Sequence, residues 1–135
     1  MKRTLMLIKP DATGRNLVGK ILSIVEEKGF KIVQIKSLKM TKKLAREFYK
    51  VHRNKEFFND LVEYMCSGLT VGVVLERENA IEYLREIVGA TDPKDAKKGT
   101  IRHTFGETFR RNSVHASDSK KSYIYEKKVF FKERR

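Results

Sequence analysis

Four stretches of the chain have the apolar patterning of β-strands. Residues 4–8 and 70–75 are short, nearly continuous apolar runs, and residues 113–116 form a third, briefer one. Residues 30–40 alternate between apolar and polar side chains, with one slip in phase that predicts a β-bulge. These segments predict a four-stranded sheet.

Other stretches repeat their apolar residues every three or four positions, which is the spacing of one helix face. Residues 17–28 follow this spacing, with Asn16 as the predicted cap and Gly29 as the stop. Further helices are predicted over residues 41–49 with Thr41 as cap, 57–65 closed by Gly68, and 80–88 ended by Gly89.

The last third of the chain is harder to assign. Residues 90–111 lose their periodicity and accumulate Thr, Gly, Pro, Lys and Arg, which predicts a long loop that is either functional or disordered. After residue 116, Ser117 or Asp118 is a candidate cap for a final helix, although residues 123–125 and 129–131 suit a strand equally well.

The order of elements predicts an α+β fold. With the paired helices and the long loop set aside, the pattern is βαββαβ. This is a ferredoxin-like antiparallel sheet with helices packed on one face and a loop insertion before the last strand. A length of 135 residues suits a single domain spanning residues 1–135.

Composition and charge narrow the class of protein. An apolar fraction of 40% and a charged fraction of 35% are typical of a globular protein. The lone Cys66 cannot form an internal disulfide, and no apolar run is long enough for a secretion signal or a membrane span, so a cytoplasmic protein is expected. The net charge of +13 favours anionic partners, and nucleotides, nucleic acid and anionic lipid all belong to that class.

The most specific chemical signal is the segment Asn112-Ser113-Val114-His115-Ala116-Ser117-Asp118. An imidazole is an effective nucleophile towards phosphorus near neutral pH, provided that a carboxylate on the other ring nitrogen fixes its tautomer. If the last segment is a helix, Glu126 lies on a face where it can supply that carboxylate. A single histidine beside a turn is more often structural than catalytic, so this pattern alone is not sufficient evidence that His115 is catalytic.

Five separated motifs, in order along nearly the whole chain, resemble the nucleoside diphosphate kinase family. They are residues 4–12 (TLMLIKPDA), the 48–68 region with Phe48-Tyr49, His52 and Phe57-Phe58, the 85–93 region with Arg85 and Gly89-Ala90-Thr91-Asp92-Pro93, residues 99–106 with Gly99-Thr100-Ile101-Arg102 and Phe105-Gly106, and residues 112–118.

The resemblance implies a phosphotransferase that passes the γ-phosphoryl group of a nucleoside triphosphate to a nucleoside diphosphate with Mg²⁺. His115 would carry the phosphoryl group on Nδ1, oriented by Glu126, which Ser117 helps to hold. Phe57 would stack on the base, and Asp118 would lie near the Mg²⁺ through water. The phosphates and ribose would be bound by Lys9, Tyr49, Arg85, Thr91, Arg102 and Asn112. The family also implies a homo-oligomer, either a tetramer or a hexamer built from dimers.

The chain departs from the family pattern at several positions, which leaves nucleotide affinity open: Lys55, Glu56, Leu69, Asp92, His103, Thr104 and Ala116. His52 and His103 have no chemical role in this interpretation. The alternative class is a single-stranded nucleic-acid binder, which shares the βαββαβ order but requires an aromatic strand motif that this chain lacks. Nucleic acid is expected only as a weak electrostatic partner.

Overall fold

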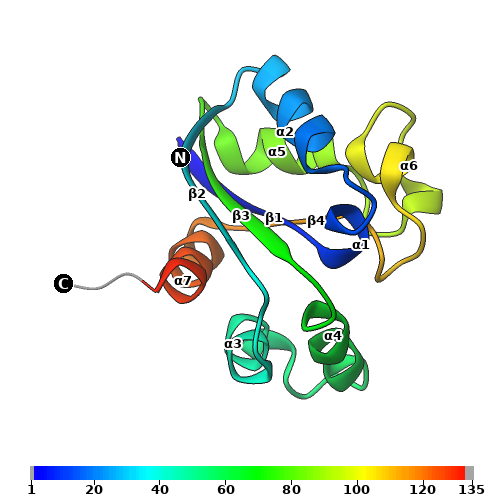
Figure 1. Ribbon diagram of the computed structural model, residues 1–135. Coiled ribbons are helices and arrows are strands. Elements are labelled where there is room, and N and C mark those ends of the chain that lie inside the picture. The colour runs from blue at the N-terminus through cyan, green and yellow to red at the C-terminus, as the bar shows by residue number, and fades with distance from the viewer. Residues whose placement is uncertain (1, 133–135) are drawn as a thin grey trace.

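A four-stranded antiparallel sheet forms the centre of the computed structural model, which describes residues 2–132 (Figure 1). The strand order is β2-β3-β1-β4, all neighbours being antiparallel. The strands are β1 (Arg3–Ile8), β2 (Lys31–Leu38), β3 (Thr70–Glu76) and β4 (Val114–Ala116). The predicted ferredoxin-like order is therefore confirmed, and the predicted bulge lies between Ile32 and Gln34 of β2.

Helices cover both faces of the sheet rather than one (Figure 1). On one face, α2 (Val18–Glu27) and α5 (Ala80–Val88) pack on Met6, Ile8 and Val73. On the other, α3 (Lys42–Phe48), α4 (Phe58–Met65) and α7 (Lys120–Phe131) pack on Leu5, Leu7 and Val74. The prediction of a single covered face was wrong, because β1 and β3 are buried on both sides and read as continuous apolar runs.

The final segment is helical throughout, so the strand alternative for residues 123–131 is wrong. Its cap is Ser119, whose hydroxyl accepts a hydrogen bond from the Ser122 N–H at 3.0 Å, and neither Ser117 nor Asp118 is the cap. Phe130 anchors this helix to the sheet. A side chain at Gly72 would begin 2.3 Å from the Phe130 ring, so β3 needs glycine at this point for α7 to approach.

The other predicted helix boundaries are partly confirmed. Thr41 caps α3 by accepting from the Leu44 N–H at 3.1 Å, and Gly89 ends α5 with a φ of 93°. Asn16 does not cap α2, because its φ of 60° turns the chain before the helix and Leu17 takes the cap position without a side-chain bond. Gly68 does not close α4, which ends at Met65 with Cys66 as a C-cap in a right-handed conformation.

The region predicted as a long loop contains two short helical turns. A 3₁₀ turn η2 (Pro93–Asp95) is capped by Asp92, and α6 (Ile101–Phe105) is capped by Thr100. Two more short elements are the 3₁₀ turn η1 (Lys50–His52) and α1 (Pro10–Thr13). Within residues 2–132, no helix has both the length and the apolar character needed to cross a membrane.

Candidate active site

His115 occupies the middle of β4, on the face of the sheet that α3 and α7 cover. Its neighbours Val114 and Ala116 point to the opposite core, so the alternation of the strand directs the imidazole towards these two helices. The rings of Phe48 and Tyr49 meet it edge-on, with centroids 5.3 and 5.9 Å away. The ring is thus held on its flanks, while 21% of the side chain stays exposed to the cavity described below.

Glu126 of α7 fixes the imidazole through one of its two nitrogens. The Nε2 atom of His115 lies 2.8 Å from Oε1 of Glu126, and the buried Ser117 hydroxyl donates to the same oxygen at 2.6 Å. An ionised carboxylate accepts only, so Nε2 carries the proton and Nδ1 keeps its lone pair. The ring nitrogen with a free lone pair is therefore Nδ1.

A cavity of about 360 Å³ opens in front of this histidine. It is lined by every predicted site residue except Ser117, namely Lys9, Tyr49, Phe57, Arg85, Thr91, Arg102, Asn112, His115, Asp118 and Glu126. These residues lie next to the ends of β1, α3 and α4, within α5, α6, β4 and α7, in the loops around α6 and in the link between β4 and α7, so the fold brings together distant parts of the sequence.

Two buried cations form the floor of the cavity. Lys9 follows β1 and donates from Nζ to the Arg110 carbonyl at 2.9 Å and to Oδ1 of Asn112 at 3.0 Å. Burial, together with the charge of Arg102, lowers the pKa of Lys9 to about 8. Arg102 donates to the Gly89 and Val114 carbonyls at 3.0 and 2.9 Å, and burial lowers its pKa to about 10.

The buried Nε of Arg102 has no hydrogen-bond partner among the described residues. Arg85 of α5, the third cation, donates to the Ala116 carbonyl at 3.3 Å and also faces the cavity. Buried cations with no carboxylate in direct contact are unfavourable unless an anion completes the site. This cavity is therefore suited to a phosphate-bearing ligand.

The Asn112 amide braces the loop that closes the cavity. Its Nδ2 donates to the carbonyls of Thr91 and Phe109 at 2.9 and 3.0 Å, while its Oδ1 accepts the hydrogen bond from Nζ of Lys9. The next residue, Ser113, has a left-handed φ of 77°, which turns the chain sharply into β4. Tyr49 is buried, and this burial raises the pKa of its hydroxyl, which stays a neutral donor.

Sequence reasoning missed part of the cavity mouth. Phe57 stands at the start of α4, with the His52 ring 5.4 Å away, so His52 lines the cavity although no role was predicted for it. Arg110 lies over the Phe57 ring at 6.0 Å and reaches Asp60 at 3.7 Å. The neighbouring Phe109 is 57% exposed, an unusual position for a large aromatic side chain that marks it as a candidate contact.

The cavity has a carboxylate placed to contact a metal ion that is held mainly by the phosphates of a bound ligand. Within residues 2–132 no group of three or more His, Cys, Asp or Glu side chains could hold a metal ion. Asp118 lies exposed on the cavity wall, and a hydrogen bond from Ser122 lowers its pKa, so it is ionised. One carboxylate beside a phosphate site fits Mg²⁺, which is usually held by a few protein oxygens and by phosphate oxygens.

An oriented imidazole with a free Nδ1, facing three cations and an ionised carboxylate, defines the site of a phosphotransferase. The fold and the comparisons with known proteins agree on which one. The model of the family described as nucleoside diphosphate kinase matches residues 2–135. The chain therefore belongs to the nucleoside diphosphate kinase family, and it is a kinase of nucleotide metabolism.

Relatives and solved structures agree over almost the full length. A nucleoside diphosphate kinase of Persephonella marina is 51% identical over 131 residues, covering 97% of this chain and 94% of the relative. One from Thermoplasma volcanium is also 51% identical, covering 97% and 89%. The crystal structure of the Aquifex aeolicus nucleoside diphosphate kinase has a TM-score of 0.94 at 45% identity and covers 96% of this chain and 94% of that one. That of the Encephalitozoon cuniculi nucleoside diphosphate kinase has a TM-score of 0.95 at 32% identity, covering 98% and 90%.

Proposed function

We propose that the enzyme transfers the γ-phosphoryl group by a ping-pong mechanism through phosphorylated His115. The observation that carries this proposal is the 2.8 Å contact between Nε2 of His115 and Glu126, which leaves Nδ1 as the nucleophile. The Nδ1 lone pair attacks the γ-phosphorus, the bond to the bridging oxygen breaks, and the diphosphate leaves. A second diphosphate then attacks the phosphohistidine through a terminal β-phosphate oxygen, and the P–N bond breaks.

The residues around His115 neutralise charge and position the phosphates, which is most of what phosphoryl transfer requires. Arg85 and Arg102 offer the guanidinium forks and Lys9 a point charge. Tyr49, Thr91 and Asn112 complete the contacts to phosphate and ribose, and the Phe57 ring stacks on the base. Stacking tolerates any base, which suits an enzyme that acts on many nucleotides.

During the transfer, Glu126 stabilises the positive charge that develops on the ring, and Ser117 keeps that carboxylate in place. We assign Asp118 to Mg²⁺ through a water molecule. When bound, Mg²⁺ would neutralise phosphate oxygens and fix their orientation. Removal of the metal with a chelator should therefore abolish measurable transfer, and added Mg²⁺ should restore it.

The decisive experiment uses γ-labelled ATP and Mg²⁺ without an acceptor. We expect a stoichiometric, acid-labile phosphoenzyme that any added nucleoside diphosphate discharges. His115→Ala should remove the label completely and still bind nucleotide, whereas His103→Ala, a control at an exposed histidine, should label normally. Label that survives acid, or that persists in His115→Ala, contradicts the mechanism.

We also infer that the chain forms a homo-oligomer, a tetramer or a hexamer of dimers as in the family. The edge strand β2 supports this, because Val33 and Ile35 are 37% and 55% exposed there. An exposed apolar edge strand favours pairing with another chain. Sedimentation of the native protein and of Ile35→Lys tests the inference, and a native monomer would refute it.

A further inference from the structure

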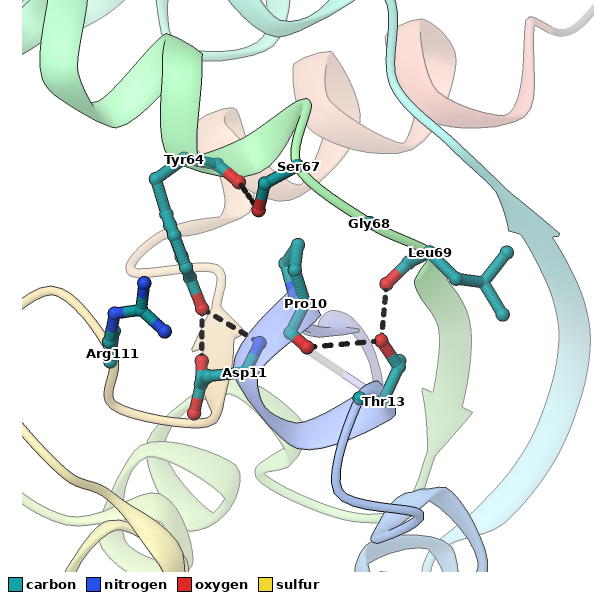
Figure 2. A pocket seen from close by; sticks show the side chains of 9 residues that line it. Pro10, Asp11, Thr13, Tyr64, Ser67, Gly68, Leu69 and Arg111 are labelled. Atoms are coloured by element: carbon teal, nitrogen blue, oxygen red, sulfur yellow. Dashed lines mark hydrogen bonds between the residues drawn. The ribbon is translucent and has the colours of Figure 1, made fainter.

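Asp11 is a buried carboxylate that the proposed mechanism does not use. It lies in α1, two residues after Lys9, and its side chain is 1% exposed. Tyr64 reaches down from α4 to meet it (Figure 2). The Tyr64 hydroxyl donates to Oδ1 of Asp11 and accepts from the Asp11 backbone N–H at 2.9 Å. A negative charge buried this close to a phosphate site repels the substrate, so it calls for a compensating role.

The first link from Asp11 runs to α4 and from there to Lys9. Burial and the hydrogen bond to Asp11 raise the pKa of Tyr64, so the phenol stays protonated and keeps donating. The ring of this tyrosine faces Lys9, whose Nζ is 5.6 Å from the ring centroid. A second tie joins α1 to the link between α4 and β3, because the Thr13 hydroxyl donates to the Leu69 carbonyl at 2.7 Å (Figure 2).

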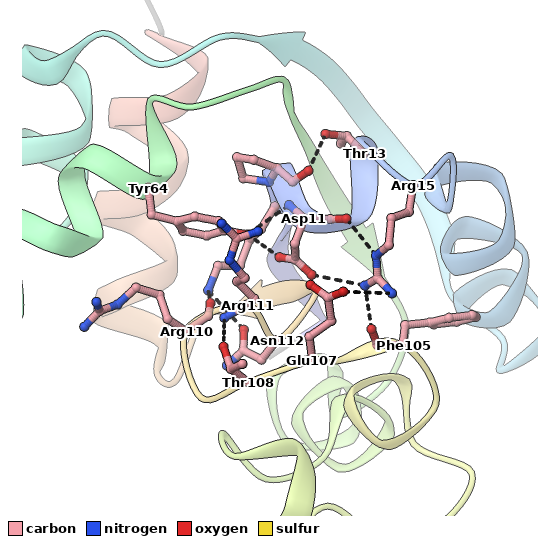
Figure 3. A network of polar contacts seen from close by, with 12 residues as sticks. Asp11, Thr13, Arg15, Tyr64, Phe105, Glu107, Thr108, Arg110, Arg111 and Asn112 are labelled. Atoms are coloured by element: carbon pink, nitrogen blue, oxygen red, sulfur yellow. Dashed lines mark hydrogen bonds and ion pairs between the residues drawn. The ribbon is translucent and has the colours of Figure 1, made fainter.

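The second link runs to α6, which carries Arg102, and to the start of the loop that leads to Asn112. Arg15 approaches Oδ2 of Asp11 at 3.3 Å and donates from Nε to the Asp11 carbonyl at 3.0 Å. The same guanidinium donates to the carbonyl of Phe105 at 2.5 Å and lies 3.9 Å from Glu107 (Figure 3). Phe105 ends α6, so Asp11, through Arg15, ties α1, which directly follows Lys9, to the helix that carries Arg102.

Asp11 also acts on the charge of Lys9. The charged groups that act on Lys9 are Arg102 of α6, Arg110 of the following loop and Asp11 of α1. The Tyr64 ring of α4 also faces Lys9, and Arg111 lies over the same ring, 5.4 Å from its centroid. Burial and then Arg102 and Arg110 lower the pKa of Lys9, whereas Asp11 raises it. Without the carboxylate, the amine would therefore lose its proton closer to neutral pH.

We infer that Asp11 is a positioning residue for phosphate binding. It holds the Tyr64 ring and the end of α6 around Lys9, and its carboxylate keeps the Lys9 amine charged. The inference rests on the proposed function, in which Lys9 contacts the nucleotide phosphates. It assigns Asp11 no contact with substrate. Its effect should therefore appear in nucleotide affinity and in the pH dependence of that affinity, rather than in the rate of transfer at saturation.

The test measures ADP affinity by calorimetry between pH 7 and 10 for the full chain and its variants. Lys9→Met should abolish the alkaline loss of affinity, which identifies that loss with Lys9. Asp11→Asn should move the midpoint of the loss down by about one pH unit, because a nearby opposite charge has effects of this size. It should weaken binding about fivefold at pH 8, while kcat changes by less than about threefold.

Arg15→Met should shift the pH midpoint of the affinity loss in the opposite direction. It keeps the carboxylate of Asp11 but removes its cationic partner, so the Lys9 midpoint should move up. A role limited to fold stability cannot move the midpoint in opposite directions in the two variants, and Arg15→Met keeps the inference testable if Asp11→Asn does not fold. Glu107→Gln is the matched control, since it removes another acid near the same guanidinium, and its midpoint should stay in place.

An unchanged midpoint in Arg15→Met, or in folded Asp11→Asn, overturns the inference, and so does an equal shift in Glu107→Gln. The proposed function is tested separately by labelling of the wild-type enzyme at His115. Normal labelling with unmoved midpoints means that only the role of Asp11 fails. Absent labelling means that the proposed function itself fails.

Discussion

The contact between Glu126 and His115 leads to a quantitative prediction. Glu126→Gln preserves the size of the side chain but removes the charge that faces Nε2 at 2.8 Å. Both side chains are mostly buried, at 12% and 21% exposed, so solvent screens this interaction little. Hydrogen bonds to charged groups contribute about 1.5–3 kcal/mol. The phosphorylation rate should therefore fall about 10- to 100-fold.

The assay is a single-turnover measurement of phosphoenzyme formation in a quenched-flow instrument, with nucleotide affinity measured in parallel. Affinity should not weaken, because the lost charge repels phosphate. Ser117→Ala is the matched control, since it removes only a neutral donor to the same oxygen, and its rate should fall about 3- to 10-fold. A Glu126→Gln rate within threefold of wild type, or a larger loss in Ser117→Ala, would refute the reasoning.

Three further predictions concern stability and charge. Gly72→Ala should destabilise the fold by about 1–3 kcal/mol, because its new methyl meets the Phe130 ring, whereas Gly19→Ala, with open space around it, should be neutral or stabilising in chemical denaturation. Thr41→Ala should cost about 1 kcal/mol by removing the cap on the Leu44 N–H. Nucleic-acid binding driven by the +13 charge should collapse between low and physiological salt while triphosphate exchange persists.

Each of these has a clear contrary result. Equal stability of the two alanine variants would mean that the sheet relaxes around Phe130. An unchanged unfolding midpoint in Thr41→Ala, with Thr41→Ser as control, would show that tertiary packing alone sets the start of α3. Equal salt sensitivity of binding and exchange would remove the distinction between nucleic acid and substrate.

The sequence predicted correctly those features that depend only on neighbouring residues, such as a β-bulge and a helix cap. The phase slip in residues 30–40 is the bulge between Ile32 and Gln34, and Thr41 caps its helix as its position before an apolar repeat predicts. The prediction that Asn16 caps α2 was wrong, because asparagine favours helix caps but also tolerates the left-handed conformation that the chain adopts there. Sequence position could not separate these two uses of asparagine.

Tertiary contacts decided what the pattern left open. The segment that became α7 mixes aromatic and charged residues with little periodicity, and its helical state follows from the packing of Phe130 and Glu126 against the sheet and His115. The helix α6 is only five residues long, too short for a repeat to be recognised. The resemblance supplied the site residues, but the cavity neighbours Arg110 and Phe109 lay outside its motifs.

The register of the sheet gives Gly72 a consequence far from its own strand. Gly72 and His115 both pair with Leu7, so the three residues form a row across the sheet. α7 crosses above this row, with Phe130 seated over the glycine and Glu126 one turn earlier at the imidazole. A methyl group added at Gly72 would push Phe130 and its end of α7 away from the sheet, and the shift would also move Glu126 relative to His115. A substitution outside the cavity would then lower the measured rate of phosphoryl transfer.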